Sequence, residues 1–208
     1  MTVDPVPASS APSAAVSAAL PTSTGVVAVC AHPDDESFGL GAVLGMLAKA
    51  GSRTGVLCFT HGEASTLHAT PGELAAVRVD ELTRAAAHLG VGRAELLTYP
   101  DAGLADQPLD ELARHVRSLA DDVGADTLVV FDLGGITGHP DHQRATDAAL
   151  AAALDSRYSV LAWTLPDTVA HALNAEFGTA FVGRADHNVD LILPVDRRRQ
   201  LGAIHHHA

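Results

Sequence analysis

Acidic and histidine side chains crowd the segment "AHPDDE", residues 31–36, which directly follows a run of small apolar residues. Carboxylates at the end of a buried strand repel one another and lose hydration, so a bound divalent cation is the simplest way to neutralise them. His32 and Asp35 are three residues apart across a turn stiffened by Pro33. This spacing lets an imidazole nitrogen and a carboxylate oxygen converge on one ion, and the segment therefore predicts half of a metal site.

The segment "GHPDH", residues 138–142, supplies a second half. Its histidines, His139 and His142, are also three apart and can share one face of a helical first turn. Three protein ligands with one open position are typical of a catalytic zinc site. We predict His32, Asp35 and His142 as the ligands, with water in the open position. Zn²⁺ is the expected metal and Fe²⁺ the alternative, since two histidines and one carboxylate also describe the facial triad of non-haem iron oxygenases.

The carboxylate that is not needed as a ligand favours hydrolysis over oxygenation. A metal-bound water has a pKa of roughly 7, and Asp34 is the natural base to take its proton during attack on a carbonyl. His139, when protonated, would stabilise the oxyanion or protonate a leaving amine. Asp141 would raise the pKa of His139 by charge proximity. The predicted catalytic residues are therefore Asp34, His139 and Asp141.

Short strand-like runs alternate with segments of helical period from Gly25 onward. We expect strands at 25–31, 53–60, 94–100, 126–132, 158–164 and 188–195, and helices at 39–51, 71–90, 109–124, 139–154 and from about 196. This alternation predicts an α/β, Rossmann-like fold, with a mostly parallel β-sheet and helices on both faces. Ligands of such sheets bind beyond the carboxyl ends of the strands, which is where both histidine motifs fall.

Composition limits the class of protein further. The 208 residues are 47% apolar and carry a formal net charge of −12, which disfavours nucleic acid as a partner. We expect a flexible Ala/Ser/Pro-rich tail over 1–24 and one domain over 25–208. No run approaches the roughly 18 apolar residues of a membrane span, and the N-terminus lacks signal-peptide features, so a cytoplasmic location is expected. Cys30 and Cys58 are expected to be buried free thiols.

The motifs "AHPDDE" and "GHPDH" together resemble the PIG-L/LmbE-like deacetylases, a family that includes N-acetylglucosaminyl deacetylases. The likeness continues through "FTHGEAS" (59–65), "RVDELTRAAAHLGV" (78–91) and "YPDAGL" (99–104). It implies the same three zinc ligands, Asp34 as general base and His139 as the group that assists the transition state or leaving group. It also implies that Arg78 and Asp101 lie close to a bound sugar. For Glu36 two tasks stay open, a hydrogen bond behind the ligands or the orientation of a loop, and the histidines at 205–207 receive no role.

The sequence thus predicts a zinc-dependent amide hydrolase that deacetylates an N-acetylglucosamine-type or related N-acyl amide substrate by attack of metal-bound water. Its partner would be a small N-acylated amino sugar or a conjugate of one. One alternative is a dinucleotide-binding oxidoreductase, because "GLGAVLG" (39–45) follows a strand and opens a helix. The adjacent acids would repel a pyrophosphate, and packing of small residues explains these glycines better. A catalytically inert sugar-binding relative is the other alternative, which the intact motifs disfavour.

Overall fold

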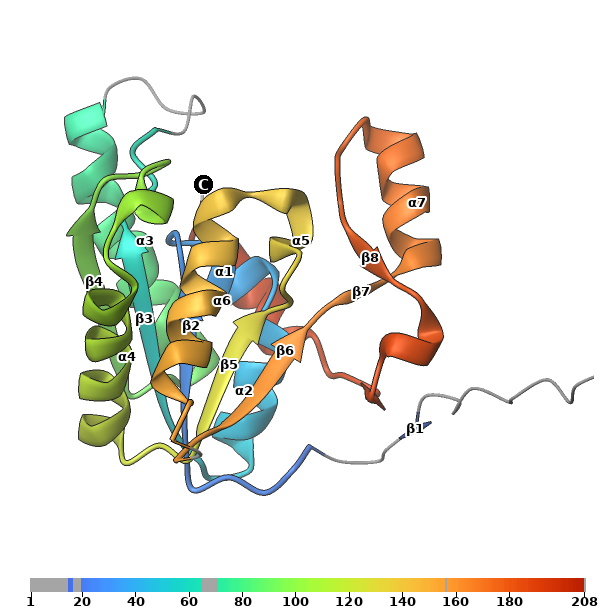
Figure 1. Ribbon diagram of the computed structural model, residues 1–208, viewed down its shortest axis with the longest axis horizontal. Coiled ribbons are helices and arrows are strands. Elements are labelled where there is room, and N and C mark those ends of the chain that lie inside the picture. Colours follow the sequence, from blue (N-terminus) through green and yellow to red (C-terminus); the bar gives the residue numbers. More distant parts are fainter. Residues whose placement is uncertain (1–14, 17–19, 65–70, 156, 208) are drawn as a thin grey trace, which may run out of the picture.

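Five parallel strands form the central sheet, in the order β4-β3-β2-β5-β6 (Figure 1). A computed structural model describes residues 15–16, 20–64, 71–155 and 157–207. The strands are β2 (Gly25–Cys30), β3 (Arg53–Thr60), β4 (Arg93–Tyr99), β5 (Thr127–Phe131) and β6 (Ser159–Trp163). The predicted α/β, mostly parallel sheet is confirmed, and its five strands match five of the six expected runs to within one or two residues.

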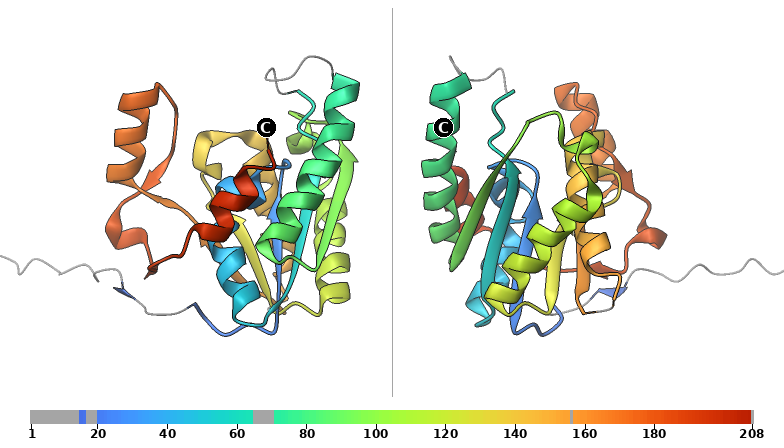
Figure 2. Two further views of the ribbon diagram at one scale, coloured as in Figure 1. Left: turned by 180° about the vertical axis from the view of Figure 1, so that it is seen from behind. Right: turned by 60° about the vertical axis from the view of Figure 1, so that its left-hand side comes forward.

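Helices cover both faces of this sheet, as the two views of Figure 2 show. Helices α2 (Gly41–Lys49), α3 (Pro71–Leu89) and α8 (Arg198–Ile204) lie on one face, and α4 (Leu109–Val123) and α6 (Pro140–Ala152) on the other. Side chains of β2 alternate between the two cores: Val27 and Val29 pack with α4 and α6, whereas Val26 and Ala28 pack with α2 and α3. Because both faces are buried, the strand reads as a continuous apolar run.

The strand order places the two histidine motifs at one crevice. From β2 the chain builds one flank with β3 and β4, and it then crosses to the opposite side of β2 to add β5 and β6. The order therefore reverses between β2 and β5, which is the position where open α/β sheets bind ligands. "AHPDDE" leaves the carboxyl end of β2, and "GHPDH" follows β5 after the short helix α5 (Gly135–Gly138). The fold thus brings together residues that are more than a hundred positions apart.

The segment after β6 differs from the prediction. It forms a lateral arm of β7 (Leu165–Pro166), α7 (Asp167–Phe177) and β8 (Gly183–Arg184), seen on the right of Figure 1, where no element was expected. The strand expected over 188–195 is confirmed only in part. Only β9 (Leu191–Ile192) forms there, and it pairs with β1 (Ala15–Val16). Pro194, which lacks a backbone donor, follows two residues later and cannot extend a ladder.

Several smaller predictions can be compared with the structure. Cys30 and Cys58 are buried free thiols, as expected. The expected helix over 39–51 begins at Gly41, after the four-residue α1 (Asp35–Phe38). Among the described residues, no helix has both the length and the apolar character needed to cross a membrane. Apart from β1 and residues 20–24, the predicted tail lies outside the described residues.

Candidate metal centre

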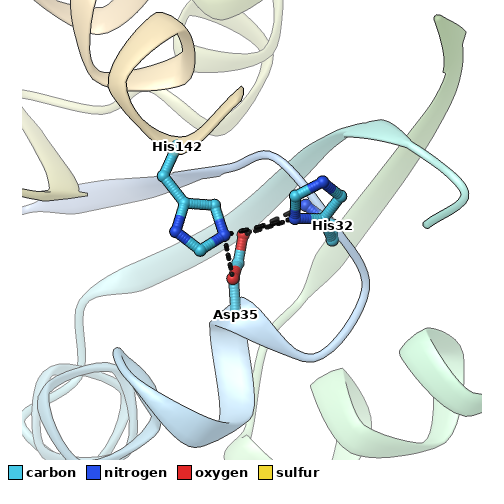
Figure 3. A group of neighbouring side chains, drawn as sticks. All are labelled: His32, Asp35 and His142. Atoms are coloured by element: carbon cyan, nitrogen blue, oxygen red, sulfur yellow. Dashed lines mark hydrogen bonds and ion pairs between the residues drawn. The ribbon is translucent and has the colours of Figure 1, made fainter. Parts of the chain in front are cut away.

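Three predicted ligands converge at the carboxyl ends of β2 and β5 (Figure 3). His32 follows β2 by two residues, Asp35 begins α1, and His142 lies in the first turn of α6. The distance from His142 Nε2 to Asp35 Oδ1 is 3.2 Å, and that from His142 Nε2 to His32 Nδ1 is also 3.2 Å. His32 Nδ1 lies 4.0 Å from Asp35 Oδ2. Two ring nitrogens and a carboxylate therefore point at one small volume.

These residues fit a tetrahedral transition-metal ion. Ligand bonds of about 2.0–2.1 Å place the donor atoms of such a site about 3.3 Å apart. All three donor atoms lie within 4.8 Å of one another, and two of the three separations already have nearly the ideal value. Imidazole and carboxylate are donors that suit Zn²⁺ and Fe²⁺ alike. The cluster of His32, Asp35 and His142 could hold either ion with small side-chain adjustments.

The outer nitrogen of each histidine has a partner that orients the ring. His142 Nδ1 lies 2.9 Å from the carbonyl oxygen of Gly135, and His32 Nε2 lies 2.9 Å from Asp101 Oδ1 and 3.6 Å from Asp141 Oδ2. Burial lowers the pKa of His32, but these two carboxylates raise it to about 10. Without a metal both ring nitrogens of His32 therefore carry a proton, and Nδ1 would have to lose its proton to bind a metal, while the carboxylates beside Nε2 keep the ring oriented. From the sequence, Asp101 was predicted only to contact a bound sugar. Its position beside the outer nitrogen of His32 was missed, because no local sequence pattern relates these two residues.

Backbone donors hold the carboxylate of Asp35, the predicted acidic ligand. Asp35 Oδ2 accepts hydrogen bonds from the backbone N–H groups of Ala31 (2.9 Å) and His32 (3.0 Å). The turn at Pro33 thus folds the Asp35 side chain back under the end of β2. The second carboxylate oxygen, Oδ1, is left facing His142.

Asp34 has the geometry expected of a base that is not a ligand. Its φ of 126° is in a region that non-glycine residues rarely adopt, so its backbone is strained. The side chain remains 38% exposed, and Oδ2 lies 3.5 Å from Arg78 Nη1. Partial desolvation of the carboxyl group is the main cause that raises the pKa of Asp34, and the negative charge of Asp35 is the second. Together they raise this pKa to about 7, although the positive charge of Arg78 opposes the rise. A carboxyl group that titrates near neutral pH is suited to general base catalysis.

His139 lies beside the predicted ligands His32 and His142, but in a different protonation state from the one predicted. The negative charge of Asp141 raises its pKa as expected, but burial, followed by the charges of His32 and His142, outweighs this effect and lowers the pKa overall. His139 Nδ1 accepts a hydrogen bond from the backbone N–H of Asp141 at 3.2 Å. The neutral ring therefore carries its proton on Nε2 and can act as a hydrogen-bond donor.

The Asp141 carboxylate fastens the loop that carries Asp101. It is fully buried and accepts hydrogen bonds from the backbone N–H groups of Ala102 (2.8 Å) and Leu104 (3.1 Å). Glu63 holds the same loop from the other side by accepting the N–H of Asp101 at 3.0 Å. This loop in turn places the Asp101 carboxylate against His32.

Arg78 and Asp101 lie next to the cluster but are largely enclosed. Arg78 donates to the carbonyl oxygen of Pro33 at 3.1 Å, and its side chain is 7% exposed. Asp101 accepts the N–H groups of Ala64 and Ala102, each at 2.8 Å, and its side chain is also 7% exposed. Both have protein partners, and their contact with a substrate stays a prediction.

The glycines of "GLGAVLG" are needed for packing. A Cβ atom on Gly39 would lie 2.3 Å from the Phe131 ring, and one on Gly41 would lie 3.1 Å from the Gln200 side chain. A Cβ atom on Gly45 would lie 3.3 Å from Arg199. Two of these contacts are with α8, so the glycines admit a helix and need no phosphate to explain them.

The fold and the cluster together define an α/β protein with a His–Asp–His centre at the switch point of its sheet. The family profile described as GlcNAc-PI de-N-acetylase (PIG-L) matches residues 27–153, which is more than half of the chain. The chain therefore belongs to the PIG-L family. The matched segment contains both histidine motifs and ends at the close of α6.

Two curated relatives illustrate the similarity. A 1D-myo-inositol 2-acetamido-2-deoxy-alpha-D-glucopyranoside deacetylase of Kineococcus radiotolerans is 31% identical over 158 residues, covering 61% of this chain and 44% of the relative. A probable N-acetylglucosaminyl-phosphatidylinositol de-N-acetylase of Schizosaccharomyces pombe is 32% identical over 132 residues, covering 60% of this chain and 50% of the relative. The chain thus spans about half the length of these relatives.

Solved structures support the fold. An N,N'-diacetylchitobiose deacetylase from Pyrococcus horikoshii superposes with a TM-score of 0.65 at 24% identity, covering 89% of this chain and 70% of that one. The similarity therefore extends beyond α6 into the C-terminal segment.

Proposed function

We propose that this protein is a zinc-dependent N-deacetylase that acts on an N-acetylglucosamine-type substrate. The observation that carries the proposal is the free Asp34 carboxyl group beside the cluster of His32, Asp35 and His142 in a chain of the PIG-L family. The names of both curated relatives describe removal of an acetyl group from a glucosamine nitrogen. The negative net charge of −12 also supports a small neutral or cationic partner over nucleic acid.

His32, Asp35 and His142 would hold the metal. When bound, it would polarise the amide carbonyl and lower the pKa of a water molecule, so that the water can lose a proton and attack the carbonyl carbon. Asp34 takes the proton that this water loses. Its pKa of about 7 suits that task, because the carboxylate is then half available at neutral pH and still basic enough to accept the proton. The exposed part of the Asp34 side chain gives water access to the carboxylate.

His139 contributes a hydrogen bond to the carbonyl oxygen as negative charge develops there. Its Nδ1 is occupied by the Asp141 N–H, so the proton on Nε2 is the one available for donation. With a lowered pKa the ring stays neutral, and the leaving nitrogen then receives the proton held by Asp34. The carbon–nitrogen bond breaks, and acetate and a free amine result.

The protein loaded with one equivalent of Zn²⁺ should release acetate from N-acetylated amino sugars. A screen would compare N-acetylglucosamine, its β-linked disaccharide and an N-acetylglucosaminyl inositol, with N-acetyl-lysine as a non-sugar control. Amine formation from a sugar substrate, lost on chelation and restored by Zn²⁺, supports the proposal. Absence of acetate from every sugar at full zinc occupancy would refute it.

A further inference from the structure

Asp34 belongs to a closed loop of five ionisable side chains, most of which are buried. We call this loop the charge ring, and its members are Asp34, Glu36, Arg78, Glu81 and His207. Around it, Asp34 Oδ2 lies 3.5 Å from Arg78 Nη1, which lies 3.3 Å from Glu81 Oε2. Glu81 Oε2 lies 3.7 Å from His207 Nδ1, and His207 Nε2 lies 2.8 Å from Glu36 Oε1. Glu36 Oε2 then accepts the backbone N–H of Asp34 at 2.9 Å, which closes the ring.

Glu36 is the member that acts directly on the Asp34 backbone. Its side chain is fully buried, and its two oxygens are divided between two tasks. Oε2 accepts the N–H of Asp34, whereas Oε1 accepts the Ser37 hydroxyl at 2.5 Å and faces His207. A buried carboxylate with only one oxygen satisfied would be costly. The partners of Oε1 therefore fix the direction in which Oε2 points.

The strained backbone of Asp34 needs such a restraint. A non-glycine residue with a φ of 126° keeps that conformation only when its surroundings over-determine it. On the other side of the residue, the Asp34 carbonyl oxygen accepts the N–H groups of Ser37 (2.9 Å) and Phe38 (2.8 Å). The Glu36 carboxylate supplies the restraint on the N–H side. If this restraint is lost, the backbone can relax and the carboxyl group turns away from the cluster.

The outermost support comes from the end of the chain. Helix α8 lies against α1 and α3, and its C-terminal end reaches the edge of the sheet that holds the cluster (Figure 2). The His207 side chain is 3% exposed and packs beside the Phe38 ring at a centroid distance of 6.3 Å. The neighbouring His205, which follows the last residue of α8, is exposed, and its Nδ1 lies near the Leu201 carbonyl oxygen. The three terminal histidines are therefore not equivalent.

We propose that Glu36 and His207 are positioning residues: His207 holds the Glu36 carboxylate, which in turn holds Asp34 in the conformation that presents its carboxyl group to the reacting water. This proposal rests on the proposed function, because it assigns Asp34 the role of base. Neither residue is among the predicted ligands, and neither needs to touch the substrate. Removing the His207 donor should thus lower the rate without removing the metal.

The sharpest test compares His207→Gln with His207→Leu. The two replacements have similar size, but only Gln keeps a donor for Glu36. His205→Ala is the matched control on the same turn. In Zn²⁺-loaded protein, His207→Leu should lower kcat about 10- to 100-fold, the range typical for loss of a supporting residue behind a metal site, with KM and zinc content unchanged. His207→Gln should recover most of the lost rate, and His205→Ala should match the wild type.

A second readout needs no substrate. Hydrogen exchange of the Asp34 backbone amide, followed by NMR in Zn²⁺-loaded protein, should be about 10-fold faster in His207→Leu than in the wild type or in His205→Ala. If His207→Leu does not fold, His207→Ala with and without added imidazole replaces it, and imidazole should restore both slow exchange and rate.

The two readouts separate this proposal from the proposed function. Faster Asp34 exchange in a protein that deacetylates no amino sugar would support the charge ring and refute the proposed function. Wild-type exchange in His207→Leu would overturn the charge ring whatever the activity. A loss of rate that is explained by a lower zinc content would also overturn it, because Glu36 and His207 would then support metal binding and not the conformation of Asp34.

Discussion

Replacing Asp34 by Asn should lower the activity and, at high pH, raise the stability of the metal-free fold. Asn has nearly the same shape and keeps the backbone N–H that Glu36 accepts, but it cannot take a proton. Loss of a general base costs typically about 10²- to 10⁴-fold in rate, which corresponds to roughly 3–5 kcal/mol in the barrier. The wild-type kcat/KM should rise with pH and level off above about 7, where the carboxyl group is ionised, and the residual activity of Asp34→Asn should lack this limb.

The same change should stabilise the metal-free fold at high pH. The pKa of Asp34 rises from its ordinary value of 3.8 to about 7 on folding, so this group destabilises the folded state progressively as pH rises from about 4 to about 7, and the full cost is present above 7. At 1.36 kcal/mol per pH unit the full effect is at most about 4 kcal/mol. Since the side chain is 38% exposed, solvent screening reduces this, and we expect about 2 kcal/mol. Asn does not ionise and avoids this cost, so its advantage should grow from pH 5 to pH 8.

The assay combines initial rates of Zn²⁺-loaded protein with urea unfolding in the presence of a chelator at pH 5 and pH 8. Metal analysis controls for an effect on zinc binding, and Asp106→Asn, on the exposed turn after β4, controls for a general effect of removing a carboxylate. A rate loss below tenfold at equal zinc content would refute the role of Asp34 as base. An equal stability change at both pH values would refute the raised pKa.

Three further predictions concern a residue beside the site, a residue at the amino-terminal end of β5, and the metal itself. Asp101→Asn should weaken zinc binding about 10- to 100-fold, because Asp101 orients the His32 ring so that its inner nitrogen faces the centre. Competition with a chelator measures the zinc affinity, and an unchanged affinity would show that Asp101 does not orient His32. Asp126→Ala should destabilise the fold by about 1–2 kcal/mol in urea, because the carboxylate accepts hydrogen bonds from Ser23 and Thr24. These bonds lower the pKa of Asp126, so its contribution should be present above about pH 4 and fade in acid, and a pH-independent difference would contradict this. Dialysis against a chelator should abolish deacetylation and added Zn²⁺ should restore it, whereas activity that survives metal removal would exclude a metal-dependent reaction.

Local patterns in the sequence were sufficient for most of the fold. Short apolar runs and longer segments of helical period predicted the five strands of the sheet and the helices between them, because strands buried on both faces are continuously apolar and helices bury one regular face. The arm over 165–184 was missed, and its helix α7 has Ala170 as its buried residue. The run "NVDLILPV" was expected to form a strand because of its apolar content, which specifies neither the length of a strand nor its pairing partner.

For the site, the sequence by itself determined which chemistry was available. The spacing of His32 to Asp35 and of His139 to His142 depends on one turn each, and such turns are specified locally by proline and by helix geometry. The tertiary structure decided what those groups face. Strand order brought His32 within 3.2 Å of His142, 110 positions away, and the packing of α8 brought His207 to Glu36, 171 positions away. Contacts of this kind depend on the whole core and leave no local pattern, which is why the role of Glu36 emerged only from the folded chain.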